Sequence, residues 1–306
     1  MTVGTRPRAR RVQAGGAGQG DRREHVRAHS TGAASTALRR VLESPRRPAR
    51  VLAAFPVGIY LEIRTELEPQ VIAVVTGDAV RLPNAMVIND PMPKVSVGDE
   101  ACVGDGAIEI GGLGLRAHRW WDPAPPLGRV DPARLASWLP VMTELCGRSP
   151  RRPGLEGNAA AELLAEGCAR GSLLLGVTAA EQLVGLGPGL TPSGDDMLSG
   201  LLLALRHLGT AAGAGRAVWL ADWLAAAVTF DARCRTTPIS ATLLHCAARG
   251  EASGEVLAVL RSLTGRQSPE PALHRLLQVG HTSGADLAWG VRAGLAAVVE
   301  LGSRER

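Results

Sequence analysis

The spacing of hydrophobic residues changes partway along the chain. Between residues 50 and 120, apolar residues occur in short β-branched runs separated by Gly, Pro and Asp, a pattern typical of strands joined by turns. The runs predict strands at 57–63, 71–75, 101–103, 107–110 and 113–115. The proline-rich segment 122–130 then predicts a linker. The front of the chain is therefore expected to be rich in β-structure.

Beyond the linker, Ala and Leu dominate and Gly or Pro ends each apolar run, which indicates helices. Helices are predicted at 132–146, 157–170, 178–184, 192–208, 214–229, 238–249, 253–263, 270–279 and 284–300. The expected fold class is α+β, with a β-rich N-terminal part followed by a larger α-helical part. We expect a disordered tail over 1–40, a β-rich subdomain over 45–125 and an α-helical domain over 130–303.

Charge is concentrated at the N-terminus. Residues 1–50 hold twelve Arg against three acidic residues, or +9, so the net charge of +5 leaves −4 for the remainder. Residues 1–35 have almost no apolar periodicity, which predicts an Arg-rich disordered tail that the fold does not need. No aromatic residue interleaves with these charges, so we expect no nucleic-acid partner.

The five cysteines have no paired spacing, which indicates a reducing compartment. The longest apolar run, around 217–230, is too short to span a bilayer and is interrupted by Asp222. A cytoplasmic protein without membrane segments is therefore expected. The histidines show no metal-ligand spacing, and neither a Gly-x-Ser-x-Gly elbow nor a P-loop occurs.

The sharpest feature is Gly-Leu-Gly-Pro-Gly-Leu-Thr-Pro-Ser-Gly-Asp-Asp at 185–196. It predicts a flexible loop that enters a helix, capped either by Thr191 before a proline or by Ser193 with Asp196 three residues on. Free N–H groups and the positive end of the helix dipole would then point out of the loop and bind an anion.

Two neighbouring carboxylates complicate that interpretation. Asp195 and Asp196 would repel a phosphate, so they fit better with a bridging Mg²⁺ ion or with hydrogen bonds from a substrate amide or ammonium. Each residue alone has an ordinary role as a turn, a cap or a dipole partner. The density of glycines, hydroxyls and carboxylates favours a functional site.

The form Ser-Gly-x-Asp-x-x-x-Gly occurs twice, at 193–200 and at 283–290. The repeat reflects either common capping chemistry or two helix N-termini that converge on one ligand. The second alternative predicts Ser193 and Ser283 within about 10 Å of each other across one pocket. Thr237, which also precedes a proline, is then expected on the rim.

These patterns give a set of candidate residues. Asp195 and Asp196 are the candidate catalytic groups, and Mg²⁺ is a candidate cofactor. The candidate substrate-binding residues are Gly187, Gly189, Thr191, Ser193, Gly194, Thr237, Ser240, Ser283 and Asp286.

The segments 185–200, 236–240 and 280–286 resemble motifs of a bacterial family that includes the AllH-type subunit of oxamate carbamoyltransferase. The resemblance extends over about 45–300 and leaves the Arg-rich start outside. It implies phosphorolysis of oxalurate to oxamate and carbamoyl phosphate in allantoin catabolism. It also implies partner subunits, one of them similar to acyl-CoA synthetases. It supplies no catalytic residue for this subunit.

Three functions stay open from the sequence. The chain is expected to be a carbamoyltransferase subunit that binds a small anionic substrate at helix N-termini. The alternatives are a non-catalytic subunit that binds a metabolite or a partner, and a Mg²⁺-dependent hydrolase that uses Asp195 and Asp196.

Overall fold

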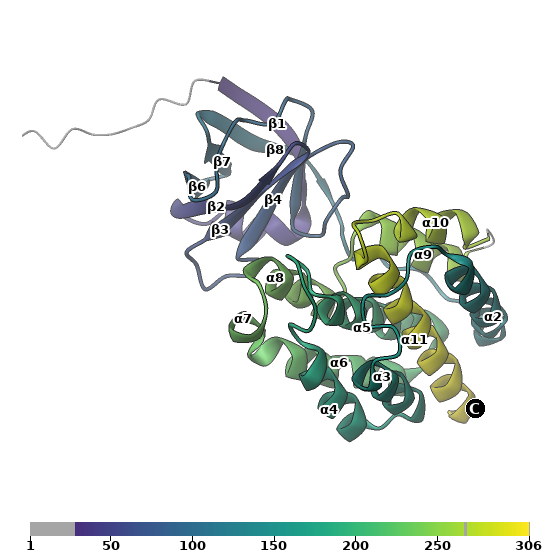
Figure 1. Cartoon of the computed structure of the whole chain (residues 1–306). Helices are drawn as coiled ribbons and strands as arrows, with labels where there is room; N and C mark the ends of the chain where they lie inside the picture. Colours follow the sequence, from purple (N-terminus) through teal and green to yellow (C-terminus); the bar gives the residue numbers. More distant parts are fainter. Residues whose placement is uncertain (1–27, 266–267, 306) are drawn as a thin grey trace, which may run out of the picture.

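The computed structural model describes residues 28–265 and 268–305 (Figure 1). A closed β-barrel precedes a larger bundle of helices, so the fold is α+β. The strands are β1 (Ala28–Ser35), β2 (Arg47–Phe55), β3 (Gly58–Ile63), β4 (Val71–Thr76), β5 (Ala85–Ile88), β6 (Glu100–Gly104), β7 (Ala107–Ile110) and β8 (Leu113–Trp121). Their order around the barrel is β1-β5-β4-β3-β2-β6-β7-β8.

The barrel encloses a core of aliphatic side chains. β3 alternates buried and half-buried positions, as expected for a strand with one face inward. β4 is buried along almost its whole length. Ile72 and Val74 point into the barrel core, whereas Val71 packs against Ile239 of the helical part. The continuous apolar run of β4 therefore attaches the barrel to the helices.

The expected tail over 1–40 is wrong for residues 28–40. Residues 28–35 form β1, which pairs with β5 and β8 and closes the barrel, and residues 36–42 form the short helices η1 (Thr36–Leu38) and α1 (Arg39–Leu42). Gly32 allows close pairing, because a Cβ there would lie 2.5 Å from the Val87 carbonyl oxygen. β1 consists mainly of small residues, so the sequence has no hydrophobic pattern that would predict a strand there. The rest of the expected tail lies outside the described residues.

The helical part begins after the linker. Its helices are α2 (Pro132–Arg148), α3 (Ala159–Arg170), α4 (Leu173–Leu183), α5 (Ser193–Ala212), α6 (Gly215–Phe230), α7 (Ala232–Arg235), α8 (Pro238–Ala248), α9 (Gly254–Thr264), α10 (Glu270–Leu277) and α11 (Ser283–Arg304). α5 is the central helix, since most of its residues are buried. α11 packs along it, although the two helices are far apart in sequence (Figure 1).

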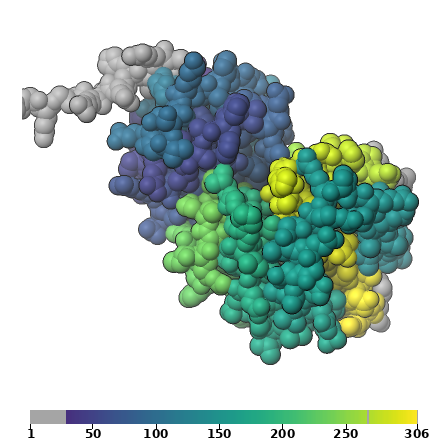
Figure 2. Space-filling model, viewed as in Figure 1, coloured from purple at the N-terminus to yellow at the C-terminus, as the bar shows by residue number. Residues whose placement is uncertain are grey.

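The barrel packs against the helical part on the side that carries α8 (Figure 1), and Figure 2 shows the two parts in contact. Within the described residues, none of the helices has the length and apolar character needed to cross a membrane.

Candidate functional site

The starts of α5 and α11 lie in direct contact. A Cβ on Gly200 would stand 2.3 Å from the Leu287 carbonyl oxygen, and one on Gly290 would stand 2.2 Å from that of Met197. Only glycine permits these two backbones to approach so closely. The final glycine of the repeated Ser-Gly-x-Asp-x-x-x-Gly form thus serves helix packing.

The serines and aspartates of the repeat meet in a reciprocal arrangement. Ser193 at the start of α5 lies against Asp286 of α11, and Ser283 at the start of α11 lies against Asp196 of α5. Thr191 Oγ1 is 3.1 Å from Ser283 Oγ and joins the second pair. The structure therefore brings the two helix starts together.

Capping at these helix starts differs from expectation. Pro192 and Thr282 occupy the N-cap positions of α5 and α11, and neither supplies a side-chain cap. The predicted caps at Thr191 and Ser193 are wrong, because both hydroxyls face α11 instead.

Backbone N–H groups of the first turns are already bonded inside the chain. Gly194 N donates to Leu186 O at 2.9 Å, and Asp196 N donates to Pro192 O at 3.2 Å. In α11, Gly284 N donates to Val279 O at 3.0 Å. These groups are not available for an anion, and the buried carboxyl groups of Asp196 and Asp286 lie where an anion would be expected.

Asp195 is a connecting residue. Its Oδ1 accepts from Gly185 N at 2.8 Å, and its Oδ2 accepts from Ser240 Oγ at 2.6 Å and from Thr236 Oγ1. Burial raises the pKa of its carboxyl, while these hydrogen bonds act in the opposite direction. The residue joins α5 to the glycine loop and to the start of α8.

Asp196 has a different environment. It is only 6% exposed, and its Oδ2 has no hydrogen-bond partner among the described residues. Burial raises the pKa of this carboxyl to about 8; the Ser283 and Thr191 hydroxyls oppose the shift, and the neighbouring Asp286 and Asp195 add to it. An unsatisfied buried oxygen costs stability unless something outside the chain pairs with it.

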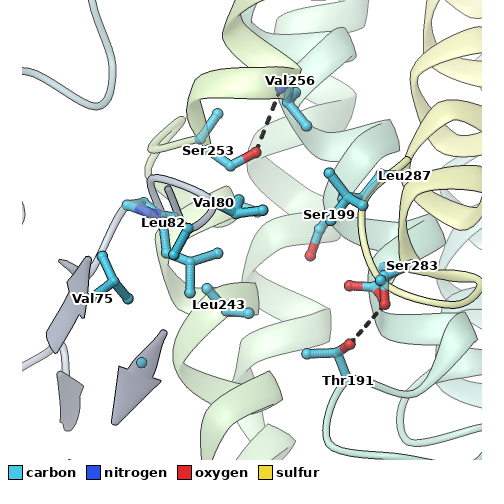
Figure 3. Close-up of a pocket in the computed structure, with 18 of the residues that line it drawn as sticks. Val75, Val80, Leu82, Thr191, Ser199, Leu243, Ser253, Val256, Ser283 and Leu287 are labelled. Atoms are coloured by element: carbon cyan, nitrogen blue, oxygen red, sulfur yellow. Dashed lines mark hydrogen bonds between the residues drawn. The ribbon is translucent and has the colours of Figure 1, made fainter. Parts of the chain in front are cut away.

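That carboxyl belongs to a pocket of about 460 Å³ between the barrel and the helical part (Figure 3). Its polar end is formed by Thr191, Asp196, Ser199 and Ser283. The remaining wall is mostly apolar and includes Val80 and Leu82 from the loop between β4 and β5, with Leu243 from α8. Its charged lining residues are Asp78, Asp196 and Glu251, and none of the described residues that line it is basic.

The other candidate residues lie outside this lining. Thr237 is the N-cap of α8, as predicted, and its hydroxyl donates to Leu190 O at 2.5 Å rather than facing the pocket. Gly187 and Gly189 have positive φ and shape the loop before α5. Ser193, Gly194, Asp195, Ser240 and Asp286 are buried in the contacts between helices.

Two residues of the site were not predicted from the sequence. Ser199 follows Asp196 by three positions on the pocket side of α5, and helical spacing could have revealed it. Gly154 donates its N–H to Asp286 Oδ1 at 2.8 Å, and no sequence pattern marks it.

The carboxyl groups of Asp195 and Asp196 contact different residues, so the two do not form a pair that could chelate one metal ion. No group of three or more His, Cys, Asp or Glu side chains suited to a metal ion occurs in residues 28–265 and 268–305.

Residues 183–295 match the family described as oxamate carbamoyltransferase subunit AllH. Over this segment the chain is similar to the AllH family. The match contains α5, α8 and most of α11, and therefore both Ser-Gly-x-Asp-x-x-x-Gly segments. The barrel lies outside it, although it supplies one wall of the pocket. No solved structure matches the chain.

Proposed function

We propose that this chain is a subunit of a carbamoyltransferase of the oxamate carbamoyltransferase type and that its pocket holds the ureido group of the substrate. The AllH match over 183–295 supports the reaction class. The single observation that carries the assignment of the site is Asp196, a nearly buried carboxyl that lines the polar end of the pocket and has one oxygen without a hydrogen-bond partner among the described residues.

A ureido group is complementary to that end. It offers N–H donors and a carbonyl acceptor, so it can pair with a carboxyl in either protonation state. The hydroxyls of Thr191, Ser199 and Ser283 stand beside the carboxyl and can donate or accept as the ligand requires.

In the proposed reaction, a phosphate oxygen attacks the ureido carbonyl carbon of oxalurate. The bond between that carbon and the oxamyl nitrogen breaks, which gives carbamoyl phosphate, and the nitrogen takes a proton to become the amide of oxamate. Asp196 is suited to give that proton and to recover one from the phosphate, because its raised pKa, about 8, keeps it protonated near neutrality.

The phosphate needs a different binding surface. Within residues 28–265 and 268–305 no basic side chain lines the pocket, and several N–H groups of the nearby helix starts are used within the chain. We therefore assign the anionic reactants to contacts with the other subunits, one of them similar to acyl-CoA synthetases. The substrate remains a small anion, as the sequence leads us to expect, but this chain is proposed to hold its ureido end.

Contact with other subunits is supported by exposed aromatic residues. Of nine aromatic residues in the chain, Trp219, Trp223 and Phe230 lie exposed along α6. Exposed apolar surface of this kind is typical of protein interfaces. The five cysteines are free, which supports a reducing compartment such as the cytoplasm, where allantoin catabolism would take place.

The test is reconstitution of the complete complex and measurement of carbamoyl phosphate formed from oxalurate and phosphate. Asp196→Asn should lower kcat by about 10²-fold or more, the usual size of a general acid–base contribution. The exposed Glu144→Gln, which removes a carboxylate paired with Arg148 on α2, is the control and should keep full activity. Full activity in Asp196→Asn, or a complex that forms no carbamoyl phosphate, contradicts the proposal.

A further inference from the structure

The pocket is much larger at its apolar end than a ureido group requires. Thr191, Asp196, Ser199 and Ser283 form one polar end at the starts of α5 and α11. Apart from Asp78, Glu251 and Ser253, the rest of the wall is mainly apolar and comes from both parts of the protein. Among its apolar residues are Tyr60, Val80 and Leu82 from the barrel and Leu203, Leu243 and Val256 from the helices.

The volume of about 460 Å³ lies in the range of sites that hold drug-sized organic molecules. A small, fully polar ureido acid would fill the end near Asp196 and leave the apolar wall in contact with water. Covering this apolar wall contributes to binding only if the ligand itself has an apolar portion that packs against it.

We infer that the pocket takes a second class of ligand, an N-substituted urea or amide with an apolar substituent. Its nitrogen end pairs with Asp196 and its substituent lies between the β4–β5 loop and α8. This inference rests on the proposed function in one respect, the use of Asp196 as the anchor for a ureido group.

The polar and charged residues of the pocket wall disfavour two other classes of ligand of the same size. A carboxylate or phosphate would meet the carboxylates of Asp78 and Glu251, and no basic side chain of the described residues lines the pocket to pair with it. A pure hydrocarbon would cover the apolar wall and leave Asp196 Oδ2 buried without a partner. A ligand with an apolar body and N–H donors at one end satisfies both ends of the pocket.

The experiment is a ligand-observed NMR titration of the full chain with N-methylurea, N-propylurea and N-pentylurea, with pentanoate as the anionic comparison. Affinity should rise about fourfold for each added methylene, and pentanoate should not bind. Val80→Asn, on the half-buried loop, should remove most of this rise and leave N-methylurea binding unchanged. Val97→Asn, the same change at a position of the barrel that is 70% exposed, is the matched control and should alter nothing.

The results of these titrations distinguish the apolar ligand class from the proposed function of Asp196. Equal affinities for the three ureas, tight binding of pentanoate, or no effect of Val80→Asn overturns the apolar ligand class. Asp196→Leu tests the anchor and should abolish binding of N-methylurea. If the ureas bind with the expected dependence on length but Asp196→Leu has no effect, the proposed function fails and the apolar site stands. If none of the ureas binds, both are overturned.

Discussion

Asp195 accepts a hydrogen bond from Ser240 Oγ at 2.6 Å, across 45 positions of the sequence. With Gly185 N and Thr236 Oγ1 as further donors, the carboxylate holds the glycine loop, α5 and α8 together. Asp196, the next residue, has a buried oxygen with no hydrogen-bond partner in the described part of the chain. Adjacent carboxylates of the same motif therefore differ in their contacts, and their substitutions should differ in effect.

Asp195→Asn should destabilise the fold. The carboxamide replaces one acceptor oxygen with a donor that must face an N–H or an O–H, so we expect a loss of about 1–3 kcal/mol in the free energy of unfolding. Equilibrium denaturation in urea measures this change. Asp222→Asn, which weakens an exposed pair with Arg206, should cost less than about 1 kcal/mol. Equal stabilities of the two variants would contradict the structural role of Asp195.

Asp196→Asn should change how stability depends on pH. The folded-state pKa of Asp196 is raised to about 8, so the folded chain holds a proton that the unfolded chain releases near pH 4. The contribution of this carboxyl is therefore fully present below about pH 4 and is lost as the pH rises to about 8. The loss is at most about 1.4 kcal/mol per pH unit.

The asparagine variant has no proton to lose at this position. Relative to the native protein it should become progressively more stable between pH 5 and pH 8, in Tm measurements at fixed salt (about 0.15 M). Above the folded pKa the difference should stop growing. A constant difference in Tm across this range would show that the carboxyl is not perturbed.

Part of this site could be predicted from the sequence. The repeat at 193–200 and 283–290 indicates that two helix starts meet, and the structure brings them together. Its serines and aspartates pair across the contact instead of capping the helices, and Ser193 lies outside the pocket lining. The helices themselves follow from regular apolar spacing and from local stop signals.

Other features depend on contacts that no local pattern encodes. β1 is built of Ala, Ser, Thr and Gly, so its apolar content is too low to predict a strand, and only pairing with β5 and β8 fixes it. The direction of each carboxylate also depends on tertiary contacts. Asp195 faces Ser240 of α8 and Asp196 faces Ser283 of α11, which the adjacent positions 195 and 196 do not reveal.

Close packing of α5 on α11 predicts sensitivity to a single added methyl group. Gly200→Ala and Gly290→Ala would place a Cβ 2.3 Å and 2.2 Å from carbonyl oxygens of the facing helix, so the helices must separate. Each change should cost about 1–3 kcal/mol or more in the free energy of unfolding. Gly302→Ala is the control in the same helix, since its Cβ would meet Ala214 at an ordinary 3.5 Å.

In the control, alanine should be neutral or stabilise α11 by up to about 1 kcal/mol, because it restricts the unfolded chain more than glycine does. Thermal unfolding of the three variants compares them directly. If Gly200→Ala and Gly290→Ala were as stable as Gly302→Ala, the two helices would not approach as closely as described.

Removal of β1 should open the barrel. β1 is the strand between β5 and β8, so a chain that starts at Leu38 leaves both of those strands with unpaired backbone groups. It also removes Ala34 and Ser35, which are fully buried. This expectation reverses the one drawn from the apolar content of residues 1–35 alone.

The matched comparison is a chain that starts at Ala28, which retains every strand of the barrel. The longer chain should melt as a single folded protein, whereas the shorter chain should lose barrel stability and aggregate through its exposed strand edges. Because the barrel supplies one wall of the pocket, the shorter chain should also lose binding of N-pentylurea. Equal Tm values and equal urea affinities for the two chains would mean that β1 does not close the barrel in solution.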